Sequence, residues 1–128
     1  MSYLLDTHAF LWFVTGDEQL PKKVKNKIEN MDNPCFLSIV SLWEITIKHQ
    51  IGKLTLEISL EELFEYAVRN RFEIMQVTPN HLLALSTLPM VHNDPFDRLI
   101  VSQALTEKCT LISKDRLLRK YTIKHQWN

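Results

Sequence analysis

Four acidic residues of this sequence lie beside or within short apolar segments, where a charged side chain is unusual. Asp6 and Asp115 each follow a short, largely apolar run. Glu44 lies inside another such run, and Asp97 lies at the start of a fourth. Because an unpaired charge beside a hydrophobic core is costly, these carboxylates need partners. Several acids from distant parts of a chain, converging at strand ends, are what a divalent-metal site requires.

The chemistry that such a set of carboxylates favours is the binding of Mg²⁺ or Mn²⁺. Both ions prefer hard oxygen ligands, and no Cys/His cluster with zinc spacing competes for a softer metal. Two carboxylates about 4 Å apart repel by about 4 kcal/mol at an effective dielectric constant of about 20. A cluster of four without a cation would therefore be unstable or partly protonated. Metal ions held by such a cluster can activate water and stabilise a phosphoryl group.

Each acid also has a purely structural explanation. Glu44 lies three residues after Ser41, which is the spacing of a helix capping box. Asp97 could stabilise the positive end of its helix, an effect of about 0.3–1 kcal/mol. Asp6 could be a solvated acid at a strand end, and Asp115 a turn residue. The metal-site hypothesis therefore depends on the four acids together.

Other polar residues carry less specific signals. Asp94 precedes Pro95, a pair typical of a helix start, so we interpret Asp94 as a cap and not as a ligand. The five histidines are scattered along the chain, and we assign none of them a catalytic role. Basic residues adjoin Asp115 and are candidates for contacts to a nucleic-acid backbone: Lys114, Arg116, Arg119 and Lys120.

Short apolar runs alternate with helical segments, which predicts an α/β fold with a mostly parallel sheet of four to five strands. We expect strands at 2–6, 35–38, 73–77 and 110–113, and an edge strand within 121–127. We expect six helices, at about 7–14, 21–31, 39–50, 59–70, from 78 onward, and 94–108. Thr7 can cap the first of them, and the third could begin at Ser41 instead of residue 39. Ligands bind at the carboxyl ends of parallel strands, so Asp6 and Asp115 should lie at one edge of the sheet.

Length and composition limit the function classes. A chain of 128 residues with 45% hydrophobic residues is expected to form a single domain, residues 1–128. Fifteen basic and fifteen acidic residues cancel, so a nucleic-acid contact must come from a local patch. Two glycines are too few for a P-loop or a dinucleotide-binding turn. We expect no leader and no membrane span, buried free thiols at Cys35 and Cys109, and a cytoplasmic location.

Four segments together resemble a known family, the PIN-domain ribonucleases of the VapC type, which are toxins of bacterial toxin–antitoxin pairs. The first segment is 4–12, and the second is 38–45 followed by 52–54. The third, 92–100, contains His-Asn-Asp-Pro-Phe-Asp-Arg and is the most specific, and 111–115 is the last. The order and spacing of the four segments carry the resemblance across essentially the whole chain.

The resemblance implies a PIN-like three-layer α/β/α fold with Asp6, Glu44, Asp97 and Asp115 as catalytic, metal-binding acids. Asp6 and Asp97 would be the principal Mg²⁺ ligands, with Mn²⁺ as a substitute. It also implies endonucleolytic RNA cleavage by metal-activated water, leaving a 5′-phosphate and a 3′-hydroxyl. The implied partners are the RNA substrate, a second copy of the chain in a homodimer, and a cognate antitoxin protein that supplies operator-DNA binding.

Three other functions remain open from the residues alone. The first is a non-catalytic PIN-like module that binds RNA or a protein. The second is a phosphatase with Asp6 as nucleophile, although the second aspartate of that mechanism is missing because position 8 is histidine. The third is a DNA-cleaving nuclease, because an acid cluster does not itself read the 2′-hydroxyl.

Overall fold

The computed structural model describes residues 1–115, 121 and 124–127. At its centre is a five-stranded sheet with the strand order β3-β2-β1-β4-β5. All the strand pairs are parallel. The strands are β1 (Tyr3–Leu5), β2 (Cys35–Ser38), β3 (Phe72–Met75), β4 (Thr110–Ile112) and β5 (His125–Gln126). The predicted α/β class and the strand count of four to five are confirmed.

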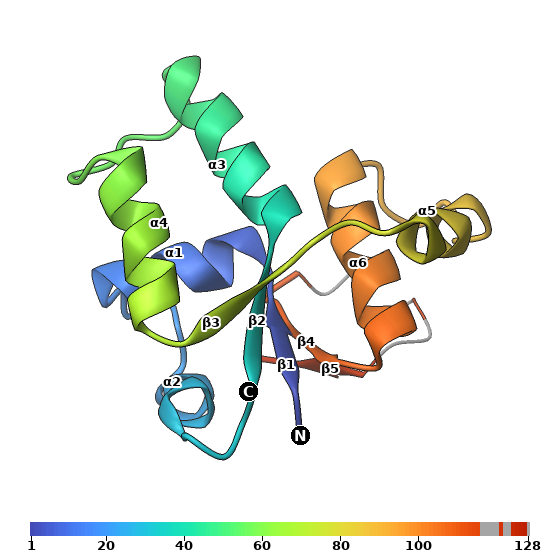
Figure 1. Cartoon of the computed structure of the whole chain (residues 1–128), viewed down its shortest axis with the longest axis horizontal. Coiled ribbons are helices and arrows are strands. Elements are labelled where there is room, and N and C mark those ends of the chain that lie inside the picture. The colour runs from blue at the N-terminus through green and yellow to red at the C-terminus, as the bar shows by residue number, and fades with distance from the viewer. Residues whose placement is uncertain (116–120, 122–123, 128) are drawn as a thin grey trace.

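Helices cover both faces of the sheet and complete three layers (Figure 1). The helices are α1 (Thr7–Thr15), α2 (Lys22–Glu29), α3 (Ile39–Gln50), α4 (Leu60–Arg69), α5 (Pro79–Ser86) and α6 (Pro95–Glu107). In Figure 1, α1, α2 and α4 lie on one side of the strands, and α5 and α6 lie on the other. The helix α3 follows β2 directly and extends from the carboxyl end of the sheet.

The strand side chains alternate between two hydrophobic clusters, as the period of two in a β-strand requires. Leu5 and Ile112 pack with the cluster that contains Phe10 of α1. Leu4 and Leu111 pack with the opposite cluster, under α6. All four strand residues are fully buried. A strand buried on both faces reads as a continuous apolar run, which explains why β1 and β4 were visible in the sequence.

The helix caps correct two details of the sequence analysis. Thr7 is not the cap of α1, because the Asp6 side chain accepts a hydrogen bond from the Ala9 N–H at 2.8 Å. The capping-box explanation of Glu44 is wrong too, since α3 begins at Ile39 with Ser38 as its cap. An aspartate or serine can cap from the last strand position or the residue after it, so no separate loop residue is needed.

The thiols and most of the remaining helix starts agree with the sequence analysis, but Pro21 is the N-cap of α2, which runs from Lys22 to Glu29 and is shorter than expected. Asp94 caps α6, and its side chain accepts hydrogen bonds from the Phe96 and Asp97 N–H groups. Both cysteines are buried and free, as predicted. The strand β3 starts and ends earlier than expected, and β5 is shorter.

Among the described residues, no helix has the length and apolar character needed to cross a bilayer. The basic residues 116, 119 and 120 lie outside the described part of the chain.

Candidate active site

Two of the four acids come together because β1 and β4 are neighbours in the sheet. Leu5 pairs with Ile112, so both strands end at the same level. Asp6 follows immediately, and its N–H donates to the Ile112 carbonyl at 3.0 Å. Asp115 lies three residues past Ile112, and its N–H donates to the Ser113 hydroxyl at 3.1 Å. The carboxyl edge of the sheet therefore presents Asp6 and Asp115 together, as the sequence analysis expected.

Asp6 is a buried acid, with 8% of its surface exposed. Burial raises the pKa of its carboxyl, and the nearby Glu44 charge acts in the same direction. Hydrogen bonds from the Ser113 side chain and the Ala9 N–H, together with the His8 charge, oppose that rise. Burial is the largest of these effects. Asp6 is thus both a helix cap and a carboxylate that a cation would stabilise.

Asp97 lies in the first turn of α6, where the Asp94 cap and Pro95 set the start of the helix. Its side chain is 24% exposed. The pKa of Asp97 is raised from 3.8 to about 7, first by burial and then by the negative charges of Asp94, Asp6 and Glu44, while His92 lowers it. Three other acids therefore lie close enough to raise the pKa of Asp97 through their charges. This effect is the repulsion between carboxylates that the sequence predicted for a cluster without a cation.

Glu44 lies next to the other acids but is almost fully enclosed, at 2% exposure. Its Oε1 accepts a hydrogen bond from the Thr7 hydroxyl at 2.6 Å. Its Oε2 pairs with the Lys48 ammonium one turn further along α3, and this bond raises the pKa of Lys48. Glu44 thus interacts with Asp6 and Asp97 through its charge, while its oxygens are bonded to Thr7 and Lys48.

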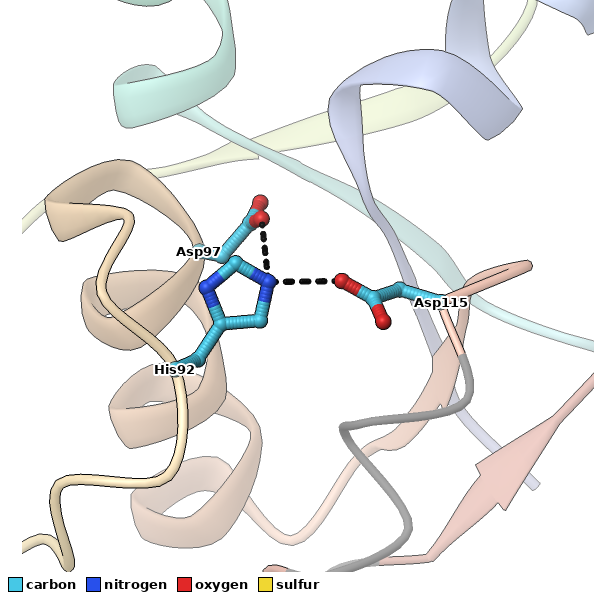
Figure 2. A group of neighbouring side chains, drawn as sticks. All are labelled: His92, Asp97 and Asp115. Atoms are coloured by element: carbon cyan, nitrogen blue, oxygen red, sulfur yellow. Dashed lines mark hydrogen bonds and ion pairs between the residues drawn. The ribbon is translucent and has the colours of Figure 1, made fainter.

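The structure adds a residue that the sequence analysis left aside. His92 lies between Asp97 and Asp115 (Figure 2), with Nε2 at 2.6 Å from Asp115 Oδ2 and 3.4 Å from Asp97 Oδ2. One ligand atom from each of these three residues fits within a group no more than 4.8 Å across. A sequence signal existed: His92 is the first residue of the most specific segment, two residues before the Asp94 cap.

These side chains open into one cavity of about 550 Å³. Its lining comes from α1, the end of β4 and the start of α6, and consists of Asp6, His8, Trp12, His92, Asp97, Lys114 and Asp115. Three of the four predicted acids line this cavity, and Glu44 is not among its lining residues. Lys114 lies over the Trp12 ring, with Nζ 5.6 Å from the ring centroid. Among the described residues, the cavity is therefore lined by three carboxylates, with the Lys114 ammonium and the Trp12 ring beside them.

The donor set fits a hard divalent cation. Carboxylates from three separate elements face the same space, and carboxylate oxygen suits Mg²⁺ and Mn²⁺. The raised pKa values of Asp6 and Asp97 have burial and neighbouring carboxylates as causes. A bound cation would offset both effects, because it stabilises the ionised form.

The Asp97 pKa leads to a prediction about stability without metal. The folded protein holds a proton on Asp97 up to pH about 7, whereas the unfolded chain loses it near 3.8. The folded state thus binds more protons between these values, and the free energy of unfolding should fall as pH rises through that window, by up to about 4 kcal/mol. Thermal melts in EDTA at pH 4.5–7.5 should show a flatter dependence for Asp97→Asn. Equal slopes in the two proteins would contradict the assignment.

The described structure is a three-layer α/β/α domain with an acidic cavity at the carboxyl edge of a parallel sheet, and comparisons with known proteins place it in a family. The family model described as "PIN domain" matches residues 3–124. The chain therefore belongs to the PIN domain family. Among curated proteins, Ribonuclease VapC22 of Mycobacterium tuberculosis is 27% identical over 123 residues, which cover 92% of this chain and 90% of that protein.

Solved structures show the same fold. The chain is similar to one in the complex VapBC2 from Rickettsia felis bound to a promoter DNA fragment, with a TM-score of 0.77 and 18% identity over 100% of both chains. It is also similar to one in VapBC-1 from nontypeable Haemophilus influenzae, with a TM-score of 0.71 and 17% identity over 98% of this chain and 97% of the other. At these identities the likeness establishes the architecture, and the expected PIN-like three-layer fold is confirmed.

Proposed function

We propose that this chain is a Mg²⁺-dependent endoribonuclease and the toxin of a VapC-type toxin–antitoxin pair, acting as a single domain over residues 1–128. The observation that carries the proposal is the meeting of Asp6, Asp97 and Asp115 in one cavity, from three separate elements. The similarity to a protein named Ribonuclease VapC22 and to chains of VapBC complexes supports the same class.

Asp6, Asp97 and Asp115 would hold the metal, and Glu44 would complete the negative charge behind them. Mn²⁺ would substitute, since it prefers the same oxygen ligands. When bound, the ion would lower the pKa of a coordinated water and neutralise the charge that develops on the phosphate. Burial and neighbouring charges raise the pKa of Asp6 and Asp97, and a bound cation would lower the pKa of both because it stabilises the ionised form.

Lys114 and Trp12 would contact the RNA. Lys114 is exposed at the cavity wall and could neutralise a backbone phosphate next to the scissile bond. Trp12 offers a half-buried indole ring, and bases of single-stranded RNA stack on such rings. The reaction assigned to the site is hydrolysis of an RNA phosphodiester bond by metal-activated water.

The partners follow from the same comparison. A cognate antitoxin would bind this chain, as the names of the VapBC complexes indicate for their own chains. Operator DNA would be bound through the antitoxin, because this chain has equal numbers of acidic and basic residues. The chain would act as a homodimer.

The proposal predicts cleavage of total cellular RNA by the purified protein. Discrete RNA fragments should appear with Mg²⁺ or Mn²⁺ and should be absent in EDTA, because the acids cannot activate water without the ion. Sequencing the fragment ends would give the cleaved sites. The same assay with single-stranded DNA would test whether the protein cleaves RNA in preference to DNA. Metal-independent binding of RNA without any cleavage would instead establish a non-catalytic PIN-like module.

A further inference from the structure

His92 is held in a defined orientation by contacts on both its backbone and its ring. Its N–H donates to the Tyr121 hydroxyl at 2.9 Å, and Tyr121 is buried. On the ring, Nδ1 accepts a hydrogen bond from the Asp94 N–H at 3.1 Å. The side chain is 14% exposed. The ring therefore does not need a metal to reach its position between Asp97 and Asp115.

The bond to Nδ1 decides which ring nitrogen carries the proton. A backbone N–H can only donate, so Nδ1 must present its lone pair to Asp94. In the neutral imidazole the proton then lies on Nε2. That nitrogen points at Asp115 Oδ2, 2.6 Å away, and it is 3.4 Å from Asp97 Oδ2 (Figure 2). Its contact with Asp115 is thus a hydrogen bond from a donor to a carboxylate.

We propose that His92 is a positioning residue of the metal site, which donates its Nε2–H to Asp115 and holds that carboxylate facing Asp97. The inference rests on the proposed function, because it concerns the same acids. Asp115 follows the last strand position of β4 by three residues and its side chain is 33% exposed. A carboxylate in such a place loses conformational freedom when it binds a metal, and a bond already made reduces that loss.

The same geometry argues against His92 as a metal ligand. Histidines that bind metals donate a hydrogen bond through their other ring nitrogen, which leaves the coordinating nitrogen unprotonated. Here the other nitrogen, Nδ1, accepts a bond from the Asp94 N–H. Coordination of a metal through Nε2 would put the ring proton on Nδ1, so that two N–H donors would face each other. A carboxylate offers about four lone-pair positions, so a bond from His92 to Oδ2 does not by itself prevent Asp115 from binding a cation.

Two substitutions separate the two ends of the ring. His92→Asn keeps a short acceptor close to the place of Nδ1, so it can still accept from Asp94, but its side chain is too short to reach Asp115. His92→Gln places an amide N–H₂ close to the place of Nε2, so it can still donate to Asp115. If His92 only supports the loop, His92→Asn should bind metal as the wild type does. If His92 positions Asp115, Gln should replace it and Asn should not.

The test is Mn²⁺ binding to the full chain, measured by the electron paramagnetic resonance signal of free Mn²⁺. Loss of a residue that orients a metal ligand weakens metal affinity by about 10–100-fold, and we expect His92→Asn to lie in that range. We expect His92→Gln to stay within about threefold of the wild type, since it retains the donor. Thermal melts in EDTA would confirm that both variants are folded before the titrations are compared.

Several results would overturn the inference, and they differ from those that would overturn the function. Wild-type affinity in His92→Asn, or a loss in His92→Gln as large as in Asn, would reject the positioning role while the metal site stands. A ¹⁴N coupling on bound Mn²⁺ that disappears in both variants would make His92 a ligand, which also rejects it. A wild-type protein that binds no Mn²⁺ would overturn the proposed function together with this inference.

Discussion

Asp6→Asn is expected to abolish RNA cleavage while the protein remains folded. Asp6 is proposed to hold the metal, and metal ions contribute several kcal/mol of charge stabilisation to such reactions. Because each 1.4 kcal/mol is a factor of ten in rate, the loss should be about a thousandfold or more. The measurement is the rate of fragment formation at saturating Mg²⁺, with total RNA or a labelled RNA that contains a cleavage site as the substrate.

The stability of this variant should be unchanged or higher. Asparagine caps helices as well as aspartate does, so the hydrogen bond from the Ala9 N–H is kept. The substitution removes a buried carboxylate whose pKa is already raised by burial, which means that the charge is unfavourable in its present surroundings. A melting temperature in EDTA at pH 8 that equals or exceeds the wild-type value would show that lost activity is not lost folding.

The matched control for Asp6→Asn is Asp94→Asn. It makes the same change of type at another helix cap, where the side chain accepts from the Phe96 and Asp97 N–H groups. Since Asp94 is assigned to capping and not to the metal, its variant should keep cleavage within about tenfold of the wild type. Full activity in Asp6→Asn, or equal loss in both variants, would remove Asp6 from its proposed role.

The second large effect is thermal stabilisation by metal. A ligand that binds only the folded state at 100 times its dissociation constant adds about 2.7 kcal/mol to the free energy of unfolding. For a chain of this size that corresponds to about 10 °C in Tm, taking about 4 °C for each kcal/mol. Mg²⁺ and Mn²⁺ should both raise Tm at pH 8, with a larger rise than at pH 6, where protons compete for Asp97.

Two variants make the thermal measurement specific for the site. Asp97→Asn should lose the metal-dependent rise in Tm, because a principal ligand is gone. Asp32→Asn carries the same change at an exposed acid before β2, at the opposite edge of the sheet, and should respond to metal as the wild type does. A flat Tm across millimolar metal in the wild type, or the same rise in all three proteins, would count against the acidic cavity as the binding site.

Much of the fold could be predicted because its signals are local. Strands buried on both faces, such as β1 and β4, read as short apolar runs. Helix starts followed from cap residues such as Ser59 and Asp94. Errors arose where two local signals competed: Asp6 and Thr7 both suit a helix cap, and only the hydrogen bond to Ala9 distinguishes them.

The acidic residues of the candidate site could be named from the sequence because carboxylates beside apolar runs are unusual, and their metal-binding roles stay predictions. How they are arranged depended on the tertiary structure. Glu44 faces Thr7 and Lys48, because α3 packs beside α1. His92 meets Asp115 across 23 positions of the chain. The sequence by itself thus determined the parallel architecture and the candidate acids, since periodicity and caps are local. Tertiary packing alone decided which side chains touch, because those contacts join segments that no local pattern relates.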